Sequence, residues 1–393
     1  MIKYLNTEGR VGEMDKFERI RKEQFPAAEK FTFLDTSTTG LFSTNARDAM
    51  IDHIESRYEN GMDMDDYFAG WALAEEMRVS VAEMINADPE EIFFSGSGSD
   101  MLNIFSNGIE IKEGANVVTS GLSFPSTPYN WVNRVGRDNV RVVEPDDGCL
   151  PCEKLFAAAD ENTVAIALCL VENTSGWRHD LAKISSFCQE KGIYLVLDTT
   201  QCIGAMKIDV KKTPVDFLVA TTYKWISGLF GLSFGYVSKR VIDKIRPTAI
   251  GWTGAKDKFD SAGYQLEFSE NANKFETGGL CWIGLKSIRE SVKIYLELGA
   301  DDVEERILEL TDYLYEKVDA SEKLGIWGHF PNENRSCITV VTYPAEWDIT
   351  DAVLKEAGIR THVQIPGRIR IALHYFNNKA DVDKLIGFLE GYE

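Results

Sequence analysis

The sequence lacks any run approaching the roughly 18 apolar residues that a membrane-spanning helix needs. Residues 1–25 have mixed charge and contain no apolar segment of the secretory-signal kind. Basic residues are scarce relative to acidic ones, since 42 lysines and arginines against 62 aspartates and glutamates give a formal net charge of -20. Such a charge disfavours binding to phosphate backbones and anionic lipids, so we expect no nucleic-acid partner and no membrane partner.

Cysteine and histidine are also few. The seven cysteines form no disulfide framework, which predicts reduced thiols and a cytoplasmic location. Cys149 and Cys152 form a C-x-x-C after the turn sequence EPDDG, and we interpret them as part of a loop. The five histidines show no metal-ligand spacing, so we expect no metal. His362 and His374 flank an arginine-rich strand and are interpreted as surface or core residues, with a substrate pocket as the alternative.

The sequence does contain short apolar runs that alternate with helical stretches, among them IFF, TVAIALCLV, GIYLVL and DFLVA. This alternation predicts an α/β fold with a mostly parallel, doubly wound sheet. The last third differs, because long amphipathic helices precede a few further strands. We therefore expect an N-terminal segment at 1–30 that packs with the small domain, a large domain at 31–282 and a small α+β domain at 283–393.

Polar residues follow several of the predicted strands. A glycine-rich turn, Ser95 to Asp100, opens a helix, where free N–H groups can bind phosphate. Asp198 ends a buried strand, and Lys224 follows another strand between apolar segments. Each has an ordinary explanation: a capped tight turn, a helix N-cap for Asp198, and a lysine that extends to water. Their conjunction at one sheet edge favours a ligand site instead.

These residue types together match the needs of pyridoxal phosphate. That cofactor takes a lysine for a Schiff base, an acid for its pyridinium nitrogen and donors for its phosphate. A desolvated lysine loses much of its preference for the charged form, and the neutral amine is the nucleophile. Lys224, Asp198 and the glycine turn supply these three elements.

The sequence resembles the class V aminotransferases of fold type I, a group that includes cysteine desulfurases, kynureninase and isopenicillin N epimerase-like proteins. The resemblance runs from FTFLDTSTTG to DVDKLIGFLE. Its most specific motifs are the Asp-x-x-Gln in LDTTQCIGA and the lysine motif TTYK followed by GLFGLSFGYVS. FETGG and RIALHYFNNKADVDKL match two further family motifs.

The resemblance implies a role for each site residue. Lys224 would bind the cofactor as a Schiff base, Asp198 would pair with the pyridinium nitrogen, and Arg370 would bind the substrate α-carboxylate. The other implied residues are Ser97, Gly98, Thr221 and Tyr223 at the phosphate, Gln201 and Asn173 at the phenolic oxygen, Phe124 stacked on the ring, Gly279 in the loop that faces the partner's phosphate, and Thr39 as a second substrate-binding residue.

Four departures from the family pattern affect the expected chemistry. Phe124 stands where many relatives stack a histidine on the ring, so the proton route through that histidine is absent. Tyr223 replaces the usual histidine before the lysine, and Gly279 replaces a threonine whose hydroxyl reaches the phosphate. The segment GIRTHVQIPGRIRIAL contains no cysteine, so we do not expect a persulfide mechanism through that loop.

We therefore expect a pyridoxal-phosphate enzyme that acts on an amino acid with a free α-carboxylate, in a homodimer with active sites at the interface. An aminotransferase is the leading hypothesis for the reaction, and a β-eliminating C–S lyase and an amino-acid epimerase are the alternatives. A nucleotide-binding α/β protein is an alternative from a different class, but it leaves Asp198, Gln201 and Lys224 without roles. A non-catalytic relative is a third hypothesis, although neither the lysine nor the acid is lost.

Overall fold

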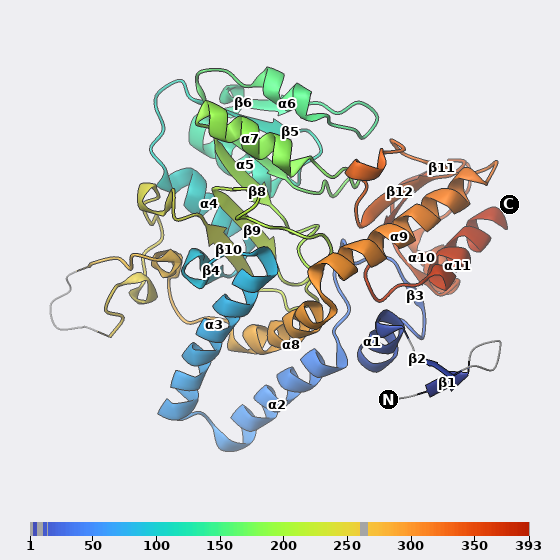
Figure 1. Cartoon of the computed structure of the whole chain (residues 1–393), viewed down its shortest axis with the longest axis horizontal. Helices are drawn as coiled ribbons and strands as arrows, with labels where there is room; N and C mark the ends of the chain where they lie inside the picture. Colours follow the sequence, from blue (N-terminus) through green and yellow to red (C-terminus); the bar gives the residue numbers. More distant parts are fainter. Residues whose placement is uncertain (1–2, 6–10, 14, 260–265, 393) are drawn as a thin grey trace.

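A computed structural model describes residues 3–5, 11–13, 15–259 and 266–392, so the predicted segment 1–30 falls partly outside the described residues. A seven-stranded sheet and a four-stranded sheet form its framework, and helices pack on both (Figure 1). Within the described ranges, no helix combines the length and apolarity needed to cross a bilayer. The same ranges contain no group of three or more metal-ligating side chains.

Seven short strands form the larger sheet in the order β4-β10-β9-β8-β7-β5-β6. Neighbours from β6 to β9 are parallel, and β10 is antiparallel to both β9 and β4. The predicted mostly parallel sheet is thus confirmed. Its strands are β4 (Ile92–Ser95), β5 (Asn116–Ser120), β6 (Val140–Val143), β7 (Thr163–Cys169), β8 (Tyr194–Asp198), β9 (Phe217–Thr221) and β10 (Ser233–Val237).

Helices cover both faces of this sheet, which explains why its strands are continuously apolar rather than alternating. Along β7, Ala165 and Ala167 pack in a cluster with α4 and α5, whereas Ile166 and Leu168 pack on the opposite face with α6 and α7. Cys152 is the first residue of α6, so the C-x-x-C expected in a loop ends in a helix. These helices are α4 (Gly98–Gly108), α5 (Ser126–Val135), α6 (Cys152–Ala158) and α7 (Leu181–Lys191).

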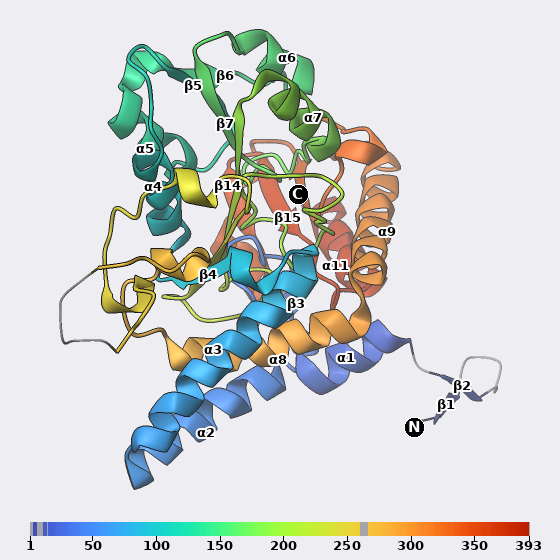
Figure 2. The same cartoon turned by 60° about the vertical axis from the view of Figure 1, so that its left-hand side comes forward.

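Three long helices lie beside the sheet (Figures 1 and 2). They are α2 (Thr44–Asn60), α3 (Met64–Ile85) and α8 (Trp282–Leu298), and α8 packs against both of the others. The start of α3 is fixed by a capping box, in which Asp63 accepts from the Asp66 N–H and Asp66 accepts from the Asp63 N–H. Since α8 contacts helices of the large domain, the division at residues 282 and 283 stays a prediction.

The second sheet has four antiparallel strands in the order β11-β12-β15-β14, and α9 and α11 pack on it in a separate hydrophobic cluster. The short strand β3 (Thr32–Phe33) pairs in parallel with β13 (Ile359–Arg360), which brings the early part of the chain to this region. The other elements here are β11 (Gly325–Ile326), β12 (Ile338–Thr342), β14 (His362–Ile365), β15 (Arg368–Ala372), α9 (Ala300–Asp319), α10 (Asp351–Glu356) and α11 (Lys379–Glu390).

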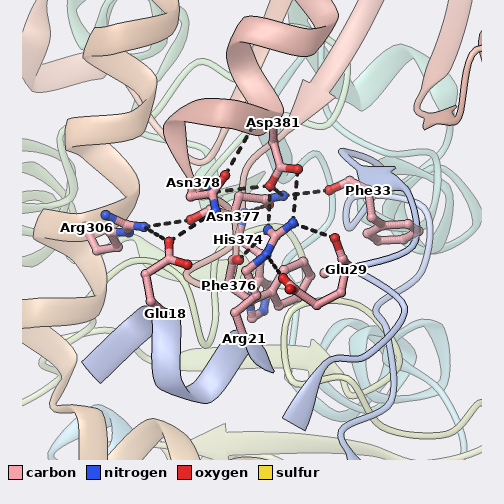
Figure 3. A network of polar contacts seen from close by, with 11 residues as sticks. Glu18, Arg21, Glu29, Phe33, Arg306, His374, Phe376, Asn377, Asn378 and Asp381 are labelled. Carbon is pink, nitrogen blue, oxygen red and sulfur yellow. Dashed lines mark hydrogen bonds and ion pairs between the residues drawn. The ribbon is translucent and has the colours of Figure 1, made fainter. Parts of the chain in front are cut away.

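A buried ion pair joins helix α1 (Lys16–Gln24) to α11 (Figure 3). The Arg21 Nη1 donates to Asp381 Oδ2 at 2.6 Å and to the Phe376 carbonyl at 2.9 Å. The remaining short elements are β1 (Lys3–Leu5), β2 (Val11–Glu13), η1 (Pro89–Glu91), η2 (Arg137–Asn139), η3 (Ile242–Lys244), η4 (Trp252–Gly254), η5 (Ala272–Phe275) and η6 (Asn332–Asn334).

Candidate active site

A cavity of about 270 Å³ lies where several strands of the larger sheet end. Parallel strands place their carboxyl ends at one edge, which is where ligands of such sheets bind. Eight of the sequence-predicted residues line this cavity: Ser97, Gly98, Phe124, Asp198, Gln201, Thr221, Tyr223 and Lys224.

Asp198 ends β8 as a buried acid that is 8% exposed. Its Oδ1 accepts a hydrogen bond from the Thr200 N–H at 2.9 Å. Among the described residues no cation lies within ion-pair distance of this carboxylate. Burial raises the pKa of Asp198, while hydrogen bonds from Thr200 and the charge of Lys224 oppose that shift. An acid in this position is stabilised as an anion by a bound cation, such as a protonated ring nitrogen.

The Lys224 amine makes no hydrogen bond or ion pair with any described residue. Its Nζ lies 5.8 Å from the ring centroid of Phe124 and 5.8 Å from that of Tyr223. Burial lowers the pKa of Lys224, Asp198 raises it, and Arg370 lowers it further. The net direction is downward, which increases the neutral, nucleophilic fraction of the amine.

The glycine-rich turn after β4 is the start of helix α4. Ser97 is the N-cap, and its hydroxyl accepts from the Asp100 N–H at 3.1 Å. The first N–H groups of a helix have no partner inside it, and they favour anions. The Ser99 hydroxyl hydrogen-bonds to the Ser126 hydroxyl at 2.7 Å, and Ser126 begins α5. Two helix N-termini therefore meet at this wall of the cavity.

Aromatic rings border the cavity near Lys224. Phe124 follows β5 and is 47% exposed. Tyr223 stacks on Phe230 with a centroid distance of 3.9 Å and an interplanar angle of 20°. The Thr221 hydroxyl beside Tyr223 is buried, and no described residue offers it a hydrogen-bond partner of good geometry. Burial raises the pKa of Tyr223, so its hydroxyl keeps its proton and remains a donor at neutral pH.

Gln201 and Asn173 differ in their placement. Gln201 lines the cavity, its Nε2 donates to the Ser37 carbonyl at 3.1 Å, and its Oε1 accepts from Trp225 Nε1 at 3.1 Å. Asn173 is absent from the cavity lining, although its Oδ1 is buried without a hydrogen-bond partner among the described residues. The Asn173 carbonyl accepts from Arg370 Nη1 at 3.3 Å. Asn173 therefore adjoins the predicted carboxylate-binding arginine.

Arg370 lies on β15 and is 7% exposed. Its Nη2 donates to Thr38 Oγ1 at 2.8 Å and lies 3.5 Å from Asp35 Oδ1. Burial lowers the pKa of Arg370 and raises that of Asp35, so for both groups burial outweighs the attraction between them. The Arg370 Nε is buried and, among described residues, unpartnered. The guanidinium thus has capacity for a further carboxylate.

Thr39 and Gly279 are not part of the cavity lining. The Thr39 hydroxyl donates to the Tyr223 carbonyl at 3.3 Å, so it contacts the backbone directly before Lys224. Gly279 is exposed, and no atom lies within 4 Å of a Cβ built on it. In the same loop, Glu276 pairs with Arg78 at 2.7 Å in a fully buried ion pair that anchors the FETGG segment.

Sequence reasoning missed three residues of this region. Cys169 ends β7, and its Sγ accepts from the Phe124 N–H at 3.4 Å. Thr200 bridges two strand ends, since its hydroxyl also accepts from the Thr221 N–H at 3.2 Å. The sequence shows Asp35 only as the acid in FTFLDTSTTG and does not indicate that it lies near Arg370. Position at a strand end was a usable signal for Cys169 and Thr200, whereas Asp35 depended on a long-range pairing.

A larger cavity of about 540 Å³ lies between α6, α7 and the Pro331–Asn334 loop, and none of the predicted site residues lines it. Size alone therefore does not identify the active site. The two histidines near Arg370 are not part of the smaller cavity's lining either. His362 is partly exposed beside Asp351, and His374 is fully buried.

The residues present fit pyridoxal phosphate. Asp198 is a buried acid without a cation, Lys224 is a free amine of lowered pKa, and two helix N-termini meet nearby. They lie around one cavity, as that cofactor's ring nitrogen, aldehyde and phosphate require.

The family model described as aminotransferase class-V matches residues 32–385. Among curated relatives, the uncharacterized aminotransferase YcbU of Bacillus subtilis (strain 168) is 26% identical over 75% of this chain and 77% of its own. The probable cysteine desulfurase of Pyrococcus abyssi (strain GE5 / Orsay) is 25% identical over 95% and 96% of the two chains. A kynureninase of Bacillus thuringiensis subsp. konkukian (strain 97-27) is 24% identical over 92% and 88%.

Solved structures share the fold. The cystine C-S lyase C-DES, in a mutant with glycine covalently linked to its pyridoxal-phosphate cofactor, superposes with a TM-score of 0.85 at 18% identity, over 95% of this chain and 99% of its own. The cysteine desulfurase of Thermococcus onnurineus NA1 superposes with a TM-score of 0.82 at 20% identity, over 97% and 98%. The fold-type-I architecture expected from the sequence is confirmed.

Proposed function

The chain belongs to the class-V aminotransferase family of pyridoxal-phosphate enzymes, and on that premise we propose that it is an aminotransferase acting on an amino acid with a free α-carboxylate. The observation that carries the proposal is the pair formed by Lys224 and Asp198. Both line one cavity, the amine has no partner among the described residues, and the buried carboxylate has no cation.

Lys224 takes two tasks in this proposal. Its amine would hold the cofactor covalently, and the same amine, when free, would accept the α-proton of the substrate. The lowered pKa of Lys224 suits the second task, because a neutral amine is needed to accept a proton. The bound cofactor supplies an electron sink for the α-carbon. Asp198 would stabilise positive charge at the cofactor's ring nitrogen and so maintain that electron sink.

The remaining predicted residues orient the cofactor and the substrate. We assign the phosphate to the start of α4, at Ser97 and Gly98, with the Thr221 and Tyr223 hydroxyls as further donors. Phe124, which lines the cavity, would cover one face of the cofactor ring. The substrate α-carboxylate would bind Arg370. An aminotransferase, a C–S lyase and an epimerase would all use this contact. These three reactions differ in the bond that forms or breaks after the α-proton has been removed.

A panel of amino acids tests the reaction type. Transamination predicts keto-acid release together with pyridoxamine phosphate that stays until an acceptor keto acid is added. Pyruvate or sulfur release without pyridoxamine phosphate would establish a lyase and reject the aminotransferase. Loss of optical purity without either product would establish an epimerase. A purified protein without any visible absorption band after cofactor supplementation would reject all three.

We further propose a homodimer, supported by an exposed apolar surface on α2 and α3 that includes Ile54, Tyr58, Met64 and Phe68, between 51% and 89% exposed. Ile54 and Tyr58 are one turn apart on α2, and Met64 and Phe68 are one turn apart on α3, so each pair offers a common apolar face that a second chain could cover. Light scattering should give twice the chain mass of 44.1 kDa. A single-chain mass at working concentration would contradict the proposal.

We also propose a cytoplasmic location. All seven cysteines are free thiols, which supports this location; recovery of the protein in a membrane or exported fraction would reject it.

A further inference from the structure

His374 follows Arg370 on the chain and is fully buried among aromatic rings. Its Nε2 lies 3.0 Å from the carbonyl oxygen of Trp225. Its ring also stacks on the Trp225 indole, with a centroid distance of 5.8 Å and an interplanar angle of 7°. His374 therefore holds the residue that directly follows Lys224 by a hydrogen bond and by a parallel ring contact.

The hydrogen bond fixes the protonation of the imidazole. A carbonyl oxygen only accepts, so the Nε2 of His374 must carry the hydrogen. Its Nδ1 is buried and has no partner in the described part of the chain. Burial lowers the pKa of His374 to about 4, although the bond to Trp225 opposes the shift. Around neutral pH the ring is thus a neutral Nε2–H tautomer that acts as a donor.

Trp225 connects this histidine to two residues of the candidate active site. It is the chain neighbour of Lys224, and its Nε1 donates to Gln201 Oε1 at 3.1 Å. On the other side of Lys224, the Tyr223 carbonyl accepts from the Gly40 N–H at 2.8 Å. Hydrogen bonds therefore fix the backbone on both sides of Lys224. His374 donates the one at Trp225, and the Gly40 N–H donates the one at Tyr223.

His374 is itself held by the network that joins α1 to α11. The backbone N–H of His374 donates to Asn377 Oδ1 at 2.8 Å, and Asn377 Nδ2 donates to Asp381 Oδ2 at 2.9 Å. Asp381 in turn pairs with Arg21 at 2.6 Å. Figure 3 shows these side chains in succession. A continuous series of hydrogen bonds thus reaches from α1 to the residue beside Lys224.

We propose that His374 is a positioning residue, which acts through Trp225 to fix the backbone at Lys224 and the orientation of Gln201. It does not touch the cavity, so it is not a proton donor to substrate. The proposal rests on the proposed function, because it takes Lys224 as the residue that binds the cofactor.

Three variants separate this role from simple core packing. His374→Phe keeps an aromatic ring against Trp225 and removes the donor. His374→Gln keeps an N–H donor and loses the ring. Tyr375→Phe is the matched control, since it removes a hydroxyl from the same aromatic cluster without touching the bond to Trp225. Each variant is studied as the cofactor-loaded enzyme, with cofactor content and thermal unfolding recorded.

His374→Phe should lower kcat at least about tenfold and leave KM within about twofold. The pH midpoint of the visible absorption change of the lysine-bound cofactor should move by about half a unit or more, because the amine's surroundings change. His374→Gln should recover most of both properties, and Tyr375→Phe should match the wild type. If His374→Phe shifts only the unfolding temperature, the inference is overturned while the proposed function stands. If the wild type shows no visible band, the proposed function itself fails.

A measurement on the wild type decides the matter even if His374→Phe does not fold. Nitrogen-15 labelling of the five histidines should show that the His374 ring carries a hydrogen on Nε2 and none on Nδ1 across neutral pH. His179 is a second buried ring, with its Nε2 2.9 Å from Glu172 Oε1, so the His374 signal is assigned by its loss in a variant. That signal should be absent from His374→Gln. An Nδ1–H tautomer of His374, which leaves Nε2 without a hydrogen, would exclude the donor bond to Trp225 and overturn the inference.

Discussion

Replacing Arg370 tests how the candidate site recognises its substrate. Arg370 is 7% exposed, and its guanidinium donates hydrogen bonds to the Thr38 hydroxyl and the Asn173 carbonyl, with Asp35 Oδ1 3.5 Å away. Because burial outweighs the attraction in this pair, the charge of Arg370 is only partly balanced before a ligand binds. An α-carboxylate would supply the remaining negative charge through a bidentate contact with the guanidinium.

The expected loss follows from the strength of such a contact. Two charge-assisted hydrogen bonds contribute on the order of 2–4 kcal/mol to transition-state binding. Arg370→Ala should then lower kcat/KM roughly 30- to 1000-fold. Arg370→Lys keeps the charge but loses the planar fork, so its loss should be smaller. Cofactor content should stay unchanged in both variants, because Arg370 does not line the cofactor cavity.

The assay is steady-state kinetics with the best amino acid from the panel and with its decarboxylated amine. Arg368→Ala is the matched control, since Arg368 lies on the same strand and contacts the Trp327 ring instead. Asp35→Asn combined with Arg370→Ala removes the unpaired acid, so it should recover thermal stability without recovering kcat/KM. The reasoning is refuted if amines react as well as amino acids and Arg370→Ala has no effect on kcat/KM.

Three other substitutions probe the cofactor site and its support. Asp198→Asn should retain bound cofactor and lose most turnover, because the ring nitrogen loses its anionic partner; near-normal kcat would contradict that role. Gly40→Ala places a Cβ against the carbonyl oxygen of the predicted cofactor-binding lysine and should abolish the visible band, whereas Gly278→Ala, with open space around it, should not. Arg78→Ala leaves Glu276 buried without a cation, so chemical denaturation should show a loss of about 3–5 kcal/mol, and an unchanged midpoint would reject the anchoring role.

Much of the fold and of the candidate site was accessible from the sequence, because both depend on strand ends. Short apolar runs indicated the strands, and the carboxyl ends of parallel strands meet at one edge. Asp198 is the last residue of β8 and Lys224 comes shortly after the end of β9, so their meeting at one cavity follows from local sequence order. The turn at Ser97 was readable as a helix start for the same reason.

The parts that were not accessible depend on contacts between distant segments. Asp35 meets Arg370 because β3 pairs with β13, more than 300 residues later in the chain. His374 was interpreted as a surface or core histidine, and only packing against Trp225 shows what it holds. Gly279 was assigned from a motif to the partner's phosphate; it is exposed and is not part of the lining of its own chain's cavity, so this role stays a prediction.

The central claim is that Lys224 binds pyridoxal phosphate covalently. Borohydride reduction of the cofactor-loaded protein, followed by digestion and mass spectrometry of the peptides, tests this claim most directly. The account predicts a single reduced pyridoxyl label on Lys224, and no label in Lys224→Ala after the same treatment. A label on another lysine, or no label in wild-type protein supplemented with the cofactor, would contradict it.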